Sequence, residues 1–520
     1  MAVSSYKHGV TWRDVPTSIV APVTADSGIP FLVGTAPVHQ IAPENRPKPD
    51  EPRIYFNFED AVAELGYSDD WRSFTLCQAM YTYFALFNCG PIICSYINNL
   101  SDPFWLDETG NADKEFTFVN GVCSFISRFV IPESLVVKDA VTSAPLTKDV
   151  DYVYSWQKDP QGSTEYFLTL SAVPGGAIPE DVDFPVLLSW WDSKPINADK
   201  SHIIGGMDIN TGFLTGIEVI ENVFPKLGVV PGILIVPFWS QDPEVAAIMS
   251  NKVDEINGCF RCITLTDVDS AKVKKAMDVK AWKDKNNYTH PRQATLWPRI
   301  GLEDRDIWLS VELGARILKT DIDNGNIPVE TPSNKLLEMN KTIVGGWGGG
   351  YPSGMPPEWG DPNAEVIFSK DYGDMLNGQG VITAINWIGG WKAWGSNMGC
   401  YPFITDPKDR WMPARRMTDY VGNSLVLTIF QKVDKPTNRR LIDTIVDTTN
   451  IWLNSLVSSG NALGARVEFR HDENPDTAMI DGHYTFHVYE FFPLPAEWIE
   501  FKLELDVSYL QVLFPEAEAA

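Results

Sequence analysis

The sequence predicts a multidomain protein of mixed α/β and α+β class, in which an α/β core is interrupted by a β-rich insertion. Two observations predict this class: buried strands alternate with helical segments before residue 100 and after residue 200, and short β segments fill the stretch between. A third is the length, because 520 residues are too many for one hydrophobic core. We expect an extended N-terminal arm at 1–27, core at 28–100, insertion at 101–199, core again at 200–390, a C-terminal α+β domain at 391–507 and a C-terminal arm at 508–520.

The core is predicted from apolar runs of strand length that alternate with capped helical segments. Asn57 and Ser73 precede helical segments and are suited to cap them. The expected strands are 28–38, 92–97, 233–238 and 260–265, and the expected helices start at 57 and 73 or span 243–256, 271–282 and 308–319.

The insertion has a different sequence pattern, with short β segments and no helical periodicity. Residues 101–195 contain 15 acidic and 6 basic residues, a net charge of −9. We therefore expect a solvent-facing module with a small core of its own.

The C-terminal domain is predicted to contain one long helix and a small sheet. Asn438 to Ser458 places apolar residues at helical spacing, and strands are expected at 466–470, 484–491 and 499–507. The result is a three-stranded meander with open edges, backed by a helix.

The end of the chain is a strand pattern without an internal partner. Ile499, Phe501, Leu503, Leu505 and Val507 alternate with charged residues, and a second apolar segment, Tyr509 to Phe514, follows. An exposed apolar edge strand invites aggregation unless something covers it. Another copy of the chain as the cover would make this segment a polymerisation device.

Composition excludes several functions. The formal charge of −26 disfavours nucleic acids and anionic membranes as partners. The N-terminus has no signal-peptide pattern, and the apolar stretch 229–239 is too short to span a membrane, which predicts cytoplasmic synthesis. Seven cysteines, an odd number, fit reduced buried thiols.

No motif selects a catalytic, cofactor or metal site. Cys259 and Cys262 are expected on opposite faces of a strand, and His483 and His487 would lie about 13 Å apart on theirs. The segment 321–326 lacks the ligand pattern of a calcium loop and is expected to be a turn after a helix. Glycines 345–350 lack the strand-to-helix context of phosphate binding, and no nucleotide-binding motif or nucleophile elbow occurs.

One basic island stands out in this acidic chain. Residues 408–440 hold eight basic and three acidic residues, a net charge of +5. Two interpretations remain open: a docking face for an acidic partner, or internal salt bridges. The basic residues are Lys408, Arg410, Arg415, Arg416, Lys432, Lys435, Arg439 and Arg440.

Several blocks of the sequence resemble contractile tail sheath proteins, the family that includes phage tail sheaths and R-type bacteriocin sheaths. They occur in the expected order and span nearly the whole chain. The blocks are Tyr6-Lys-His-Gly-Val10, Val15-Pro-Thr-Ser-Ile19, Phe31-Leu-Val-Gly-Thr-Ala-Pro37, Leu65-Gly-Tyr-Ser-Asp-Asp-Trp71, Asn386-Trp-Ile-Gly-Gly-Trp-Lys-Ala-Trp394, Asn438-Arg-Arg-Leu-Ile-Asp-Thr-Ile445 and Tyr509-Leu-Gln-Val-Leu-Phe514.

The resemblance implies a structural subunit rather than an enzyme. Subunits would stack as six-membered rings around an inner tube, exchange terminal strands with neighbours, and contract without nucleotide when a baseplate triggers them. The implied partners are other copies of the chain, the tube protein, the baseplate and the tail terminator. The insertion would face outward, and particle release would follow lysis.

The resemblance also implies roles for particular residues. The intersubunit arms would use Val10, Trp12, Val15, Tyr509, Leu510, Val512, Leu513 and Phe514. The acceptor sheet would present Tyr484, Phe486, Val488, Ile499, Phe501, Leu503 and Leu505. The tube would be met by Lys408, Arg410, Arg415, Arg416, Arg439 and Arg440.

Two other functions remain open from the residues alone. An α/β enzyme could form a closed oligomer through the terminal strands, with an active site built from carboxylates that spacing does not single out. A static shell protein could display the β-rich insertion.

Overall fold

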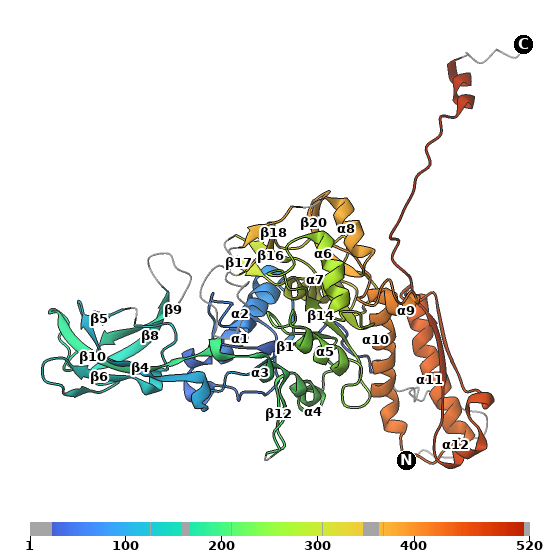
Figure 1. The fold of residues 1–520 in the computed structure, drawn as a ribbon. Coiled ribbons are helices and arrows are strands. Elements are labelled where there is room, and N and C mark those ends of the chain that lie inside the picture. The colour runs from blue at the N-terminus through green and yellow to red at the C-terminus, as the bar shows by residue number, and fades with distance from the viewer. Residues whose placement is uncertain are drawn as a thin grey trace, which may run out of the picture.

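The fold was taken from a computed structural model, which describes residues 23–124, 126–158, 166–209, 211–303, 305–346, 363–367 and 369–513. It is a mixed α/β multidomain structure with several sheets, as the sequence predicts. Three parts lie in a row: a β-rich part, a central α/β part and a C-terminal part built on two long helices (Figure 1). The predicted arm residues Val10, Trp12, Val15 and Phe514 lie outside the described residues.

The central part is built on an eight-stranded sheet whose six inner strands run parallel. The outer strands β2 and β21 pair antiparallel with their neighbours. The strands in spatial order are β2 (Arg53–Tyr55), β3 (Ile92–Tyr96), β1 (Pro30–Gly34), β13 (Ile233–Ile235), β14 (Ile263–Asp267), β15 (Gln293–Leu296), β20 (Val381–Trp387) and β21 (Gly390–Trp394).

Helices cover both faces of this sheet, which explains why its inner strands are apolar on both sides. On β1, Leu32 faces one buried cluster, whereas Phe31 and Val33 face another. The first cluster contains α1 (Phe58–Leu65), α2 (Thr75–Met80), the π-helix Tyr81–Leu86 and α7 (Leu309–Asp323); the second contains α3 (Lys200–Ile204), α4 (Val223–Leu227) and α5 (Pro243–Lys252).

Smaller elements complete the central part. Helices α6 (Ala276–Lys285) and α8 (Lys370–Asn377) contribute to a cluster around Trp297. A four-stranded sheet is formed by β17 (Arg305–Ile307), β16 (Arg299–Leu302), β18 (Lys341–Val344) and β19 (Ala364–Glu365), and a separate hairpin by β11 (Gly206–Met207) and β12 (Leu214–Thr215).

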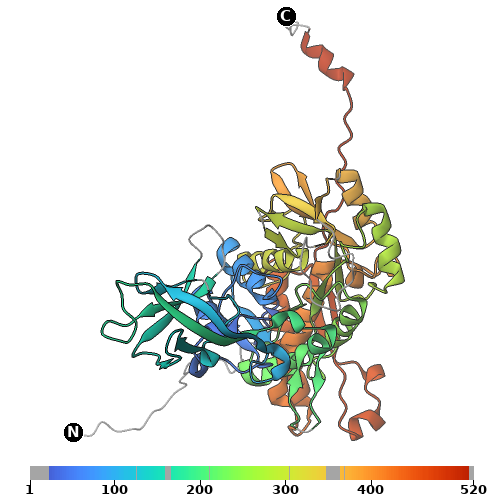
Figure 2. The ribbon, with the colours of Figure 1, turned by 60° about the vertical axis from the view of Figure 1, so that its left-hand side comes forward.

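The β-rich part is a pair of antiparallel sheets packed around their own core, which includes Phe118, Leu168 and Val186. The chain enters on β4 and leaves on β10, which pair with each other, so both connections reach the central part at one place (Figure 2). One sheet has the order β4 (Leu106–Phe118), β10 (Phe184–Ser193), β6 (Val136–Asp139), β7 (Pro145–Leu146); the other has β5 (Val122–Cys123), β9 (Tyr166–Ala172), β8 (Tyr152–Lys158).

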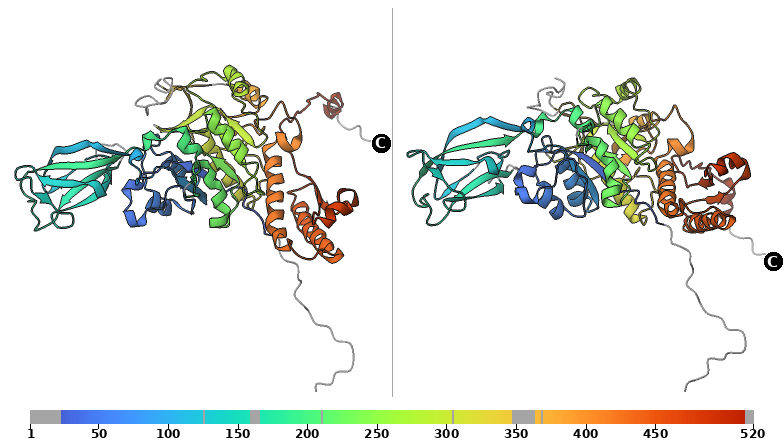
Figure 3. Two further views of the ribbon diagram at one scale, coloured as in Figure 1. Left: turned by 60° about the horizontal axis from the view of Figure 1, so that its bottom comes forward. Right: turned by 90° about the horizontal axis from the view of Figure 1, so that it is seen from below.

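The C-terminal part packs two long helices and a two-stranded sheet around Met417, Trp452 and Leu453 (Figure 3). Asn438 caps the second helix, as predicted, by accepting a hydrogen bond from the N–H of Leu441. Its elements are α9 (Pro407–Arg410), α10 (Met412–Ile429), α11 (Arg439–Ser458), β22 (Gly464–Glu468), α12 (Asp476–Ile480) and β23 (His487–Phe491).

Several expected elements differ in the structure. The predicted third strand, 499–507, is extended but unpaired through Asp506, and the predicted terminal strand begins instead as a 3-10 helix, Val507–Leu513. A strand needs a partner for its backbone groups, and a single copy of the chain supplies none here among its described residues. The meander therefore has two strands rather than three.

Two further predictions were wrong in detail. Ser73 does not cap a helix; its carbonyl accepts a bond from the Thr35 hydroxyl, and α2 begins at Thr75. The strand β21, which falls in the range expected for the last domain, pairs with β20 in the central sheet.

Candidate assembly surfaces

The C-terminal segment exposes an apolar face that nothing in the described chain covers. Phe501 is 84% exposed, and Leu503 and Leu505 are each 96% exposed. Tyr509, Leu510, Val512 and Leu513 are also exposed, on the 3-10 helix. The segment leaves the body beyond the buried Phe492 and extends away from it (Figures 1 and 2). Such a surface is typical of a chain segment that packs on another molecule.

The predicted acceptor sheet is smaller than expected. Phe486 and Val488 pack against the C-terminal core and Tyr484 is half-buried, but Ile499, Phe501, Leu503 and Leu505 lie outside the sheet. The assignment of these last four residues to an acceptor sheet within one copy is therefore wrong. Their exposure leaves them suited to the donated segment instead.

The two outer edges of the β22–β23 sheet are not equivalent. On β22, the N–H of Val467 donates to Asn450 Oδ1 at 2.8 Å, and Asn450 Nδ2 donates to the Val467 carbonyl at 3.1 Å. Val467 pairs with Val488 on β23. Backbone groups of an antiparallel pair alternate between facing each other and facing outward, so Val488 turns its own groups to the opposite edge. Among the described residues, the edge of β23 is therefore the open one at this position.

The basic island divides into two exposed groups with a buried pair between them. Lys408 and the half-exposed Arg410 precede the first turn of α10, whereas Arg439 and Arg440 lie beyond its other end, together with Lys432 and Lys435. Eighteen residues of helix separate the groups by roughly 27 Å. The island is therefore not one continuous patch.

Arg415 and Arg416 are buried, 5% and 3% exposed, and the prediction that they meet a tube is wrong. Arg416 pairs with the buried Asp321 of α7 and donates to the Ser27 carbonyl at 3.0 Å. Arg415 pairs with Asp409 at 2.9 Å and with Asp419 at 3.1 Å. A buried arginine requires such partners, so these two side chains hold α10 in place.

The same helix also holds the residues that follow the predicted N-terminal arm. The N–H of Val23 donates to Thr428 Oγ1 at 3.1 Å, and that of Ala25 donates to Ser424 Oγ at 3.0 Å. The residues that directly follow the predicted N-terminal arm therefore lie along α10. This helix belongs to the same part of the molecule as the β22–β23 sheet.

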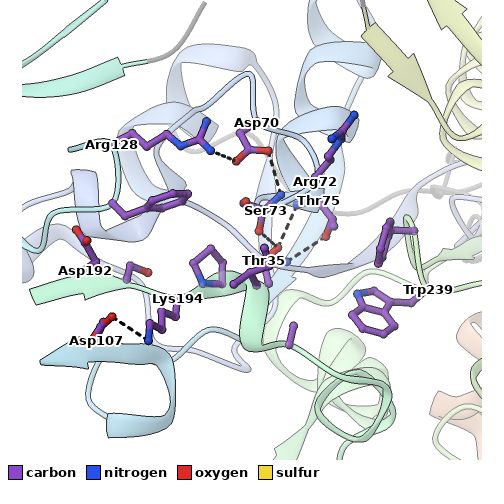
Figure 4. Close-up of a pocket in the computed structure, with 16 residues that line it drawn as sticks. Thr35, Asp70, Arg72, Ser73, Thr75, Asp107, Arg128, Asp192, Lys194 and Trp239 are labelled. Atoms are coloured by element: carbon purple, nitrogen blue, oxygen red, sulfur yellow. Dashed lines mark hydrogen bonds and ion pairs between the residues drawn. The ribbon is translucent and has the colours of Figure 1, made fainter. Parts of the chain in front are cut away.

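A cavity of about 450 Å³ lies between the central part and the base of the β-rich part (Figure 4). It lies beyond the carboxyl ends of β1 and β13, where strand order reverses, at a position that often binds ligands in α/β folds. Four of its charged side chains, however, pair with one another: Arg128 with Asp70 at 3.3 Å and Lys194 with Asp107 at 2.9 Å. We assign the cavity to the joint between the two parts.

The motifs that first suggested chemistry lie apart. Cys259 is exposed in a turn and Cys262 is buried just before β14, rather than both lying on a strand. His483 precedes β23, and His487 on β23 contacts Glu473. The described residues contain no group of three or more histidine, cysteine, aspartate or glutamate side chains arranged to hold a metal ion.

The glycine-rich loop is only partly described. Arg299 donates to the carbonyls of Gly345 at 3.1 Å and Gly346 at 2.9 Å. The rest of the loop, from residue 347, lies outside the described residues. No helix in the described chain has the length and apolar character needed to cross a membrane.

Comparison with known proteins found a similar sequence and similar solved structures. No family model matches. The tail sheath protein of Burkholderia phage BcepMu is 22% identical over 517 residues, 98% of this chain and 99% of that protein. This chain is similar to a phage tail sheath protein along nearly the whole length of both chains.

Solved structures show a likeness of fold. A chain from the contracted PVC sheath complex, an extracellular contractile injection system, has a TM-score of 0.54 and 12% identity over 98% of this chain and all of that one. A chain from the contracted helical sheath of the anti-feeding prophage has a TM-score of 0.53 and 12% identity over 97% and 100%. The resemblance read from the sequence blocks is confirmed.

Proposed function

We propose that this chain is the structural subunit of a contractile tail sheath, which polymerises around an inner tube and drives that tube through a target envelope. The observation that carries the proposal is the similarity to a phage tail sheath protein along 98% of the chain. The uncovered apolar face of residues 499–507 supports it, because a polymer subunit needs such a face.

Assembly proceeds by strand exchange between copies. The segment 499–507 of one copy, followed by Tyr509 to Phe514, adds to the open edge of β23 in a neighbour, while the N-terminal arm with Val10, Trp12 and Val15 adds to another neighbour. A head-to-tail contact of this kind need not close, so it can propagate along a helix. The stack of six-membered rings is the arrangement that the resemblance to tail sheath proteins implies.

Contraction requires no nucleotide in this proposal. The extended lattice is metastable, and subunits move to a state with better contacts when the baseplate triggers them. The inner tube, the baseplate and the tail terminator are the other partners. The chain is made in the cytoplasm and released in particles on lysis.

Deletion of Ile499–Ala520, the whole of the donated segment, tests the strand exchange. We expect folded monomers with an unchanged melting temperature that no longer form long tubes, because the linking segment is missing. Negative-stain electron microscopy measures tube length, and circular dichroism measures folding. Deletion of Glu516–Ala520 alone is the matched control, because it retains Tyr509 to Phe514, and it should leave tubes intact. Tubes of normal length from the longer deletion would refute the arm assignment.

A further inference from the structure

Two hairpins outside the terminal segments expose large apolar side chains. The first is the β11–β12 hairpin, in which Met207, Ile209 and Phe213 are 64%, 94% and 72% exposed. Its base is well formed, because the N–H of Asp208 donates to the Phe213 carbonyl at 2.9 Å. A hairpin with a hydrogen-bonded base and three such side chains in water is typical of a contact surface.

The second is the turn of the β20–β21 hairpin. Trp387 and Ile388 are 49% and 79% exposed. The two glycines that follow have φ values of 90° and 118°, which a tight turn at this point requires. Leu336, 49% exposed, adjoins the turn: a Cβ atom placed on Gly390 would lie 3.5 Å from its side chain. These three side chains form the turn patch, which stands on a strand of the central sheet.

The two apolar surfaces lie on opposite sides of the central part. In Figure 1 β12 lies on the lower side of the central part and β20 on its upper side. They belong to different elements and neither covers the other in one copy. Complementary apolar surfaces at different places on one molecule make a heterologous contact, which repeats without closing.

We propose that the β11–β12 hairpin of one copy packs on the turn patch, Leu336, Trp387 and Ile388, of the next copy along the sheath. The inference rests on the proposed function and names a contact that the terminal arms do not make. The partner is a second copy of this chain, because both surfaces are apolar, opposed and present on every copy. Aromatic residues and methionine, represented here by Phe213, Trp387 and Met207, are enriched in contacts between proteins.

Cysteine cross-linking tests the contact. Of the seven cysteines only Cys259 is exposed, so Cys259→Ser gives a suitable background. In that background, Ile209→Cys and Ile388→Cys are combined in one chain, rods are assembled and then oxidised, and the products are separated under denaturing conditions. Because each copy carries both thiols, we expect a ladder of covalent multimers from rods and none from unassembled protein.

A matched control pairs Ile209→Cys with Val141→Cys, since Val141 is 81% exposed on the β-rich part. This pair should give no ladder. A ladder from the control alone, or no ladder from Ile209 with Ile388 in rods that do form, would overturn the contact. Absence of rods from the unmodified chain would instead count against the proposed function, so the two failures can be told apart.

Substitutions give a second readout. Phe213→Ser and Trp387→Ser should each raise the protein concentration needed for rod assembly roughly tenfold, with monomer melting unchanged. Val141→Ser, which also removes an exposed apolar side chain, should not. Equal assembly of all three variants would contradict the contact.

Discussion

Glu312 is the clearest case of a residue whose setting the sequence conceals. It lies on α7 with no exposed surface, and one carboxyl oxygen accepts a bond from the N–H of Glu338 at 2.6 Å. The other oxygen is buried without a hydrogen-bond partner among the described residues. Burial, helped by the charge of Glu338, raises the pKa of Glu312 to about 8. The carboxyl group is therefore protonated at neutral pH.

This pKa predicts a pH-dependent stability. An unfolded glutamate loses its proton near pH 4.5, whereas the folded carboxyl keeps it to about 8, so folding binds a proton between these values. Stability from this group is complete below pH 4.5 and is lost as the pH rises toward 8. We expect Glu312→Gln, which mimics the protonated acid, to remove this loss and to be more stable than the parent chain at pH 9, by on the order of 5 kcal/mol.

Thermal melting between pH 5 and pH 9 measures the effect. The exposed Glu59→Gln on α1 serves as control and should follow the parent chain. An identical pH dependence of melting in Glu312→Gln and the parent would show that the Glu312 carboxyl is charged in the fold.

The role of a single residue could be predicted from the sequence where its partner lies within one helical turn. Asn57 and Asn438 cap their helices as predicted, with bonds to residues three positions on. The burial of Arg415 and Arg416 was not predictable in this way. The carboxylate that pairs with Arg416 belongs to Asp321, which is 95 positions away in the sequence. No sequence spacing distinguishes these arginines from the exposed Arg439 and Arg440.

At the scale of elements, the first turn of α11 carries charges that destabilise the helix. Arg439 and Arg440 occupy its first turn, which contains no acidic residue, and the positive end of a helix dipole repels cations. Arg439 is 86% exposed at its side chain, and only Asp443 one turn later compensates. A destabilising pair of exposed arginines suits contact with an acidic partner, and we propose the inner tube as that partner.

Charge reversal separates the two roles of this helix end. Arg439→Glu with Arg440→Glu should stabilise α11 by a net of about 0.5 kcal/mol, because acids suit a helix N-terminus and this gain exceeds the loss of the pair between Arg439 and Asp443. The same variant should bind the inner tube more weakly. Melting temperature and co-assembly with tubes would therefore change in opposite senses.

Lys114→Glu with Lys148→Glu, two exposed residues of the β-rich part, is the control for charge alone and should leave co-assembly unchanged. Undiminished co-assembly of the variant at Arg439 and Arg440 would place the tube against another surface.

Periodicity predicted elements well when their partners lie in the same copy. The strands β1, β3, β13 and β14 all fall at or near their expected ranges, because burial on both faces leaves an apolar run. It failed for 499–507, where the alternation is real but the partner is absent from one copy. It also missed α10, whose buried arginines, aspartate and asparagine hide the apolar stripe.

At the scale of the whole molecule, the row of three parts places the acidic β-rich part at one end and the C-terminal part at the other (Figure 1). The α10 helix joins the C-terminal part to the centre through Arg416 and Asp321, and also holds the chain next to the N-terminal arm. In the proposed sheath, the β-rich part faces outward and the C-terminal part faces the tube. The order of the three parts could be predicted from the change in hydrophobic pattern along the sequence. Their packing could not, because it depends on contacts between residues that are distant in the sequence.

Electron microscopy of the purified full-length chain, alone and with its inner tube, tests the central claim most directly. We predict hollow rods built of stacked rings, in a narrow extended form around the tube and a shorter, wider form after contraction. A discrete compact oligomer, with no rods under any condition, would contradict the account.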